Sequence, residues 1–154
     1  MFLRTLIMAL LLMLTCSPAI HALQKPDDRE ALAGLTVAKV IFDVRVADVD
    51  KLVFNLRLFD ETLEGMVAQG IKPDMIIAFR GPSVKLLTAA TLDEEAIALF
   101  KSLKKRGVRF EACAVAMRVF KADPAVLIQE VKLVANVFNS FIGYQNKGER
   151  KSVV

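Results

Sequence analysis

The sequence predicts an α/β protein, a three-layer α/β/α sandwich around a mostly parallel sheet of four or five strands. Segments rich in β-branched and aromatic residues alternate along the chain with segments whose apolar residues recur at helical spacing. One segment, 75–79 (MIIAF), is continuously apolar, which is typical of a strand covered on both faces. Strands that alternate with helices indicate βαβ units, because parallel strands need a crossover connection between them.

The first βαβ unit occupies residues 39–79. We expect strands at 39–46 (KVIFDVRV) and 71–79, since both are apolar, rich in β-branched residues and bounded by turn residues. The intervening segment has apolar residues at helical spacing. Asp48 is its expected N-cap, and Gly70 is expected to end it.

The next unit leads to the third strand. The residues 80–83 (RGPS) break the second strand, and a short helical turn is expected to follow. The residues 91–94 (TLDE) have the pattern of a capping box before an amphipathic helix, which Gly107 ends. The third strand, 108–112, then leads directly to Cys113.

The last part of the chain completes the alternation. We expect a helix at 114–120, a short helical turn at Asp123-Pro124 and a fourth strand at 130–137 (EVKLVANV). The final helix is expected at 139–147, capped by Asn139 or Ser140, with residues 152–154 as a short edge strand.

Residues 1–22 have the features of a secretory signal peptide. Arg4 supplies a positive start, residues 6–14 are an unbroken apolar run, and Ala22 offers a small residue at the cleavage site. The apolar run is too short to span a bilayer, so no membrane insertion is expected after cleavage. The predicted location is the periplasm or the outside of the cell. A lipoprotein modified at Cys16 is the less favoured alternative, because Thr15 fits poorly before a lipidated cysteine.

Cleavage after Ala22 would leave 132 of the 154 residues, enough for one domain with its own core. We expect residues 23–37 to form a polar lead-in and residues 38–154 to form the domain. The loss of Arg4 would leave 20 basic and 17 acidic residues, a net charge of +3. So small a surplus argues against a nucleic-acid partner.

Two features exclude whole classes of function. The only histidine, His21, lies in the leader, so the domain has no imidazole for a Ser-His or Cys-His nucleophile pair or for a zinc site. The loop after the first strand, 47–50 (ADVD), has two carboxylates and no glycine, so it does not form a phosphate cradle. We expect neither a metal nor a cofactor.

Cys113 is the candidate reactive residue, because it follows a strand end and begins a helix. The turn after the second strand is expected on the same edge of the sheet. There Arg80, Gly81 and Ser83 form a candidate anion-binding site, with Arg118 as a further positive charge. Glu111 has the same strand parity as Cys113, so its carboxylate is expected to oppose ionisation of the thiol. The alternative is that Cys113 is a small apolar core residue and that 80–83 is a plain turn.

Three segments resemble the DsrE/DsrF-like family of small sulfur-metabolism proteins. Residues 107–113 (GVRFEAC) resemble the family's strand that leads to its cysteine, and residues 79–87 (FRGPSVKLL) resemble its strand-Gly-Pro-helix segment. Residues 142–148 (IGYQNKG) are similar to its C-terminal helix, and the resemblance spans about residues 39–154. The resemblance implies a parallel fold that is flavodoxin-like in general architecture. Arg80 stands where the family commonly has a histidine.

The resemblance also implies a function. It suggests a homotrimer or larger ring, and a role in sulfur oxidation or relay in which a cysteine carries sulfane sulfur as a persulfide. Cys113 is the residue that matches the family's cysteine. We therefore expect a periplasmic sulfur carrier whose partner is a sulfur-donor or thiol-redox protein. The alternative is a non-catalytic homo-oligomeric or small-ligand-binding domain in which Cys113 only packs.

Overall fold

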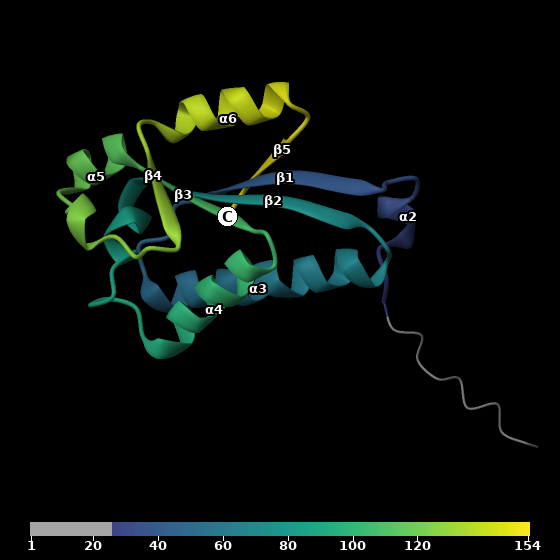
Figure 1. The fold of residues 1–154 in the computed structure, drawn as a ribbon, viewed down its shortest axis with the longest axis horizontal. Coiled ribbons are helices and arrows are strands. Elements are labelled where there is room, and N and C mark those ends of the chain that lie inside the picture. Colours follow the sequence, from purple (N-terminus) through teal and green to yellow (C-terminus); the bar gives the residue numbers. More distant parts are fainter. Residues whose placement is uncertain (1–25) are drawn as a thin grey trace, which may run out of the picture. The chain divides into compact units, whose positions relative to one another are not determined.

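The computed structural model describes residues 26–154 (Figure 1). The predicted signal peptide and its cleavage site lie outside these residues. Arg29–Leu32 forms a four-residue helix, α2, in the stretch expected to be a loose lead-in. The residues Ala33–Val154 form one compact unit that holds the whole sheet. No helix within residues 26–154 has the length and apolar character needed to cross a membrane.

All five strands of this unit run parallel in a single sheet, in the order β4-β3-β2-β1-β5. This confirms the predicted α/β class and its parallel sheet. The strands are β1 (Val37–Val44), β2 (Lys72–Phe79), β3 (Arg109–Cys113), β4 (Val131–Val134) and β5 (Arg150–Val153).

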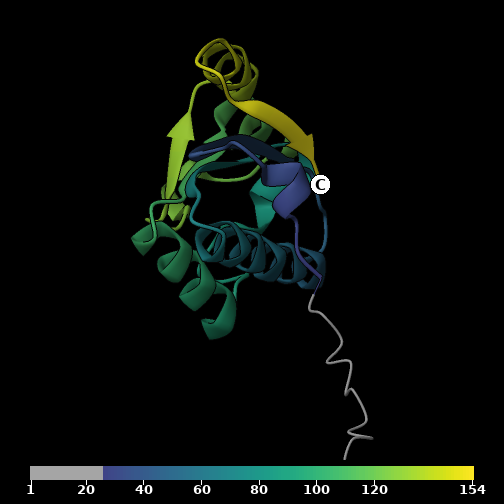
Figure 2. The ribbon, with the colours of Figure 1, turned by 90° about the vertical axis from the view of Figure 1, so that its right-hand side faces the viewer.

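The helices form a layer on each face of the sheet, as the sequence predicts. The helices α3 (Val49–Ala68) and α4 (Glu94–Lys105) cover one face, and α6 (Val137–Asn146) crosses the other (Figures 1 and 2). The short helix α5 (Ala114–Phe120) packs against the 3₁₀ helix η2 (Gly81–Leu86) beyond the ends of β2 and β3. A second 3₁₀ turn, η3 (Pro124–Val126), precedes β4.

Two apolar layers hold these elements together. On the α3 and α4 side, Phe79, Phe100 and Phe110 pack ring against ring with centroids 4.8–6.3 Å apart. On the α6 side, Ile41 and Phe141 belong to a cluster that also contains Cys113. The central strand β2 contributes residues to both layers, which explains its continuous apolar sequence.

Two predicted helix starts are wrong. The helix α4 begins at Glu94 with Asp93 as its N-cap, because the Asp93 carboxylate accepts a hydrogen bond from the Ala96 backbone N–H at 2.8 Å. The expected capping box at 91–94 is therefore misplaced, and the Thr91 hydroxyl instead lies 2.9 Å from that of Thr88.

The second wrong start belongs to α6. The side chain of Asn136 accepts a hydrogen bond from the Phe138 backbone N–H at 3.0 Å, and the helix begins at Val137. The predicted fourth strand, 130–137, thus ends at Val134, and neither Asn139 nor Ser140 is the cap. The other boundaries differ less: β1 begins and ends two residues before the predicted first strand, and β5 begins at Arg150.

Candidate functional site

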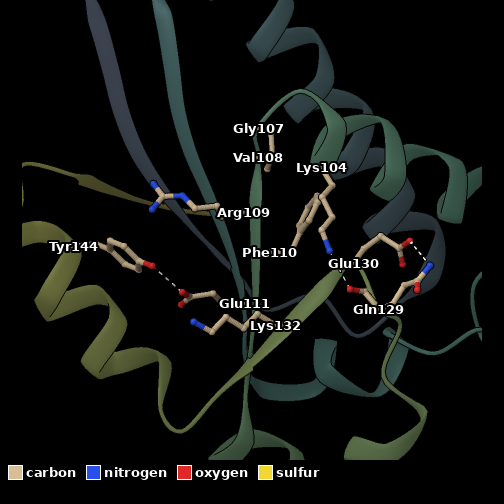
Figure 3. A pocket seen from close by; sticks show the side chains of 10 residues that line it. All are labelled: Lys104, Gly107, Val108, Arg109, Phe110, Glu111, Gln129, Glu130, Lys132 and Tyr144. Atoms are coloured by element: carbon tan, nitrogen blue, oxygen red, sulfur yellow. Dashed lines mark hydrogen bonds between the residues drawn. The ribbon is translucent and has the colours of Figure 1, made fainter.

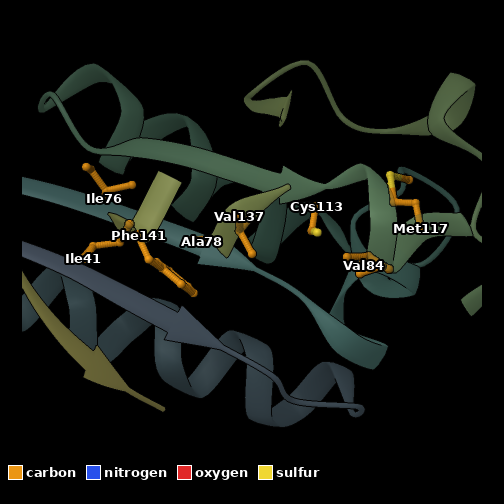
Figure 4. Packing of buried hydrophobic residues seen from close by; sticks show 9 residues of the cluster. Ile41, Ile76, Ala78, Val84, Cys113, Met117, Val137 and Phe141 are labelled. Atoms are coloured by element: carbon orange, nitrogen blue, oxygen red, sulfur yellow. The ribbon is translucent and has the colours of Figure 1, made fainter. Parts of the chain in front are cut away.

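Cys113 lies at the carboxyl end of β3 and is the residue immediately before α5. It is the free cysteine of the described chain, and it is only 4% exposed. Figure 4 shows its sulfur near Val84, Met117 and Val137, residues of the same apolar cluster. Within residues 26–154, the only polar group at hydrogen-bonding distance is the Asn136 side-chain oxygen, 4.0 Å from the sulfur. The thiol is therefore covered in this conformation.

Arg80 follows β2 directly, as Cys113 ends β3, but its side chain binds Asp43. The two residues follow Phe79 and Ala112, which pair across β2 and β3. The guanidinium of Arg80 donates two hydrogen bonds to the Asp43 carboxylate, at 2.7 and 2.8 Å. Its positive charge is thus engaged by β1 rather than directed at the sulfur.

Asp43 joins three parts of the chain. It is fully buried on β1, and besides Arg80 it binds the ammonium of Lys151 on β5 at 3.0 Å. Burial alone would raise the pKa of this carboxyl, but the hydrogen bonds and charges of Arg80 and Lys151 outweigh that effect and hold its pKa below the usual range. Arg80 also lies over the Phe138 ring, and Lys151 lies over that of Phe141.

The turn after β2 has its expected shape, and its serine hydroxyl is bound to the backbone. Gly81 has a φ of 62°, in the left-handed region that favours glycine. The hydroxyl of Ser83 is fully buried and lies 3.1 Å from the Val44 carbonyl oxygen and 2.9 Å from that of Arg80. Ser83 therefore binds the backbone and does not cap η2. Arg118 is exposed on α5.

The structure thus brings four of the five predicted site residues to one edge of the sheet. Arg80, Gly81 and Ser83 share one turn, and η2 packs against the helix that follows Cys113. These residues do not form an open anion-binding site in this conformation, because the guanidinium of Arg80 and the hydroxyl of Ser83 already bind protein atoms. The roles predicted for these residues remain predictions.

A polar site that the sequence reasoning missed lies further along the same face of β3. Glu111 is 4% exposed and lines two cavities of about 390 and 350 Å³, together with Lys132 and Tyr144; Figure 3 shows the larger one. The hydroxyl of Tyr144 on α6 donates a hydrogen bond to one Glu111 carboxylate oxygen at 2.9 Å. The other carboxylate oxygen is buried and has no hydrogen-bond partner in the described chain. The sequence signal that could have revealed this site is a glutamate within a predicted strand, on the same face of the strand as a buried residue.

Further charged residues lie between this site and the start of β3. Arg109 lies over the Tyr144 ring and pairs with Asp74, and its guanidinium is 3.7 Å from Glu149. Burial and the hydrogen bond to Glu111 raise the pKa of the Tyr144 phenol. Burial, followed by the negative charge of Asp74, raises the pKa of the Glu149 carboxyl. No three His, Cys, Asp or Glu side chains within residues 26–154 are placed to hold a metal ion.

Comparisons with known proteins agree with this architecture. The DsrE/DsrF-like family pattern matches residues 23–151. A protein of unknown function from Methanobacterium thermoautotrophicum, MTH1491, superposes with a TM-score of 0.62 at 19% identity, over 76% of this chain and 99% of that one. The ychN protein from E. coli superposes with a TM-score of 0.58 at 14% identity, over 76% and 97%. No curated protein matches the sequence. At these identities the two structures show the fold, while the family pattern spans most of the chain: the protein belongs to the DsrE/DsrF-like family.

Proposed function

We propose that this protein serves sulfur metabolism outside the cytoplasm by holding sulfane sulfur as a persulfide on Cys113. Three observations support the proposal. The chain belongs to the DsrE/DsrF-like family, and Cys113 lies at the carboxyl end of a parallel strand, where ligands of open α/β sheets gather. It is also the one thiol of the described residues. The single observation that carries the proposal is the position of this lone sulfur at the end of β3.

The reaction needs only a persulfide donor. The Cys113 thiolate attacks the outer sulfur of a donor R–S–SH, the donor's S–S bond breaks, and R–S⁻ leaves as a thiolate. The product is Cys113–S–SH, and no external oxidant is required. Because the only histidine of the chain is His21 in the predicted leader, the described domain supplies no imidazole base, and it suits a carrier better than a hydrolase.

The burial of Cys113 gives the carrier a specific form. The sulfur is covered by the beginning of α6, at Asn136 and Val137, and by Val84 of η2. A persulfide held there is shielded from water and from competing thiols, since a closed site prevents side reactions. Loading and release then require the start of α6 or η2 to move away from the sulfur.

A second candidate function rests on the same burial. A cysteine that is 4% exposed among aliphatic side chains also suits a pure packing role, and the guanidinium of Arg80 is already paired with Asp43. The protein is then a non-catalytic homo-oligomer, a trimer or larger ring, or a binding domain for a small ligand. Phe138 and Ile142, which α6 exposes by 52% and 61%, are the residues that an oligomer contact there would cover.

One experiment separates the two candidates. The full chain, with Cys16→Ala so that Cys113 is the only thiol whether or not the leader is removed, is incubated with inorganic polysulfide and its intact mass is measured. A persulfide carrier gains sulfur, and the matched Cys113→Ser variant does not. An unmodified mass, or an equal gain by Cys113→Ser, contradicts sulfur carriage at this residue.

The alkylation rate of the native protein provides a second test. A gated thiol reacts with iodoacetamide slowly but measurably in the folded state, and its rate rises with pH as the thiolate forms. A packing thiol reacts only when the whole domain unfolds. The packing candidate is supported if, at every pH, the alkylation rate equals the rate for the unfolded chain multiplied by the equilibrium constant for global unfolding.

A further inference from the structure

We propose that the cavities beside Glu111 bind a small zwitterion, a molecule with a primary ammonium next to a carboxylate, as in a free amino acid. The site consists of Glu111, Lys132 and Tyr144, the three residues that line both cavities (Figure 3). It is separate from Cys113, which lines neither cavity. The proposal does not depend on the sulfur chemistry described above.

The buried carboxylate provides the first half of the argument. Glu111 is 4% exposed, and Tyr144 donates to only one of its two oxygens. The second oxygen has no donor within residues 26–154. Buried polar atoms are nearly always hydrogen-bonded, and a carboxylate oxygen without a donor is costly. Since Glu111 lines both cavities, we infer that a shift of the surrounding side chains lets a donor group on a bound molecule reach this oxygen.

The second half is a cation that the protein leaves unpaired. Lys132 is directly opposite Glu111 in the pairing of β3 with β4, and it is exposed. Among the ion pairs of the described chain, none involves Lys132. The other cations of the larger cavity have partners: Lys104 donates to the Gln129 carbonyl oxygen at 3.0 Å, and Arg109 pairs with Asp74.

These two charges lie on adjacent strands, roughly 5 Å apart at the backbone. An α-ammonium that donates to the free oxygen of Glu111 therefore places its own carboxylate within reach of the Lys132 ammonium. A plain anion is repelled by Glu111, and a plain cation is repelled by Lys132. Val108 and Phe110 also line the larger cavity, but Phe110 packs against Phe79 and Phe100 on the α4 side of the sheet, so the proposal rests on the two charges.

An NMR titration of the exported protein tests the site with three probes of similar shape. L-leucine carries both charges, isoamylamine only the ammonium and isocaproate only the carboxylate. We expect L-leucine to shift the backbone amides of Glu111, Lys132 and Gly143, with half-saturation at about tenfold lower concentration than either half-probe, since each charged hydrogen bond contributes about 1.5–3 kcal/mol.

Two variants and a matched control complete the experiment. Lys132→Met and Glu111→Gln each weaken L-leucine binding about tenfold or more, whereas Lys101→Met on the exposed side of α4 leaves it unchanged. Lys132 is exposed, so its variant decides the question even if Glu111→Gln does not fold. The proposal is overturned if L-leucine shifts none of the three amides at saturating concentration. It is also overturned if Lys132→Met binds as tightly as Lys101→Met, or if isoamylamine binds as tightly as L-leucine.

Discussion

Replacement of Asp43 by asparagine tests the buried ion cluster that connects β1, β5 and the turn after β2. The carboxylate is fully buried and accepts hydrogen bonds from Arg80 at 2.7 and 2.8 Å, while Lys151 lies at 3.0 Å. Asp43→Asn keeps the size of the side chain but removes the charge that two cations face. The expected result is a large loss of stability, because a broken buried ion pair leaves uncompensated charge behind.

The size of the stability loss in Asp43→Asn depends on how deeply its partners Arg80 and Lys151 are buried. Removal of one member of a buried pair costs about 3–5 kcal/mol. The side chains of Arg80 and Lys151 are 19% and 28% exposed, so both can turn partly toward water. We therefore expect the lower end, about 3 kcal/mol. For a domain of this size that loss lowers the unfolding midpoint by about 10 °C.

The pH dependence gives a second, independent signature. The pKa of Asp43 is lower in the folded state than its ordinary value of 3.8, so its stabilising effect is present above that value and is lost as the pH falls through the folded pKa. The free energy of unfolding, measured by denaturant titration with circular dichroism, should differ most between wild type and Asp43→Asn near neutral pH. The two curves should converge below pH 3.8.

A matched control is the same kind of change on the surface. Glu95 pairs with Arg57, and both side chains are more than half exposed, so Glu95→Gln should cost no more than about 1 kcal/mol. In Arg80→Met the loss caused by Asp43→Asn should be smaller, because one of the two cations is already absent. The reasoning is refuted if Asp43→Asn and Glu95→Gln have equal effects at neutral pH, or if the Asp43→Asn effect does not change with pH.

Three further predictions concern the start of α4, the aromatic core and the buried carboxyl of Glu149. Asp93→Ala should destabilise the domain by about 1 kcal/mol in chemical denaturation, while Thr91→Ala changes little; equal effects would contradict the helix start at Glu94. Phe100→Ala should cost about 3–5 kcal/mol, because the ring is fully buried between Phe79 and Phe110; a loss below 1 kcal/mol would show that the core there is loose. Glu149→Gln should stabilise the protein at neutral pH. The pKa of this carboxyl is raised in the folded state, so the stability that depends on its neutral form is complete below pH 4.5 and is lost as the pH rises through the folded pKa. A gain in the stability of Glu149→Gln that persists below pH 4.5 would therefore contradict the prediction.

The sequence predicts this architecture well where the pattern is local. The apolar run at 75–79 is the buried end of β2, and the acidic and glycine residues at either end of α3 mark its limits to within two residues. The β4-to-α6 junction was mispredicted because Val137 suits a strand by its own preference. Val137 is helical because it packs in the same cluster as Phe141, one helical turn later, and because Asn136 caps the helix before it.

The candidate site depends on contacts that no local pattern contains. The position of Cys113 at a strand end follows from the order of elements, but its cover comes from Val84 and Val137, which are far from it in sequence. The partner of Arg80 is Asp43, 37 residues earlier. The sequence signal for this pair was Asp43 itself, an acidic residue in an apolar strand on the same face as Ile41, because a buried carboxylate needs a cation as its partner.

The position of β5 has a consequence for how the chain folds. This strand comes after all the others in the sequence, yet it pairs with β1, which comes first. During synthesis one edge of β1 therefore keeps its backbone amides and carbonyls unsatisfied until residues 150–153 have been made. An open edge of this kind recruits strands from other molecules, so copies in which residues 150–153 have not yet paired with β1 are exposed to mispairing with one another.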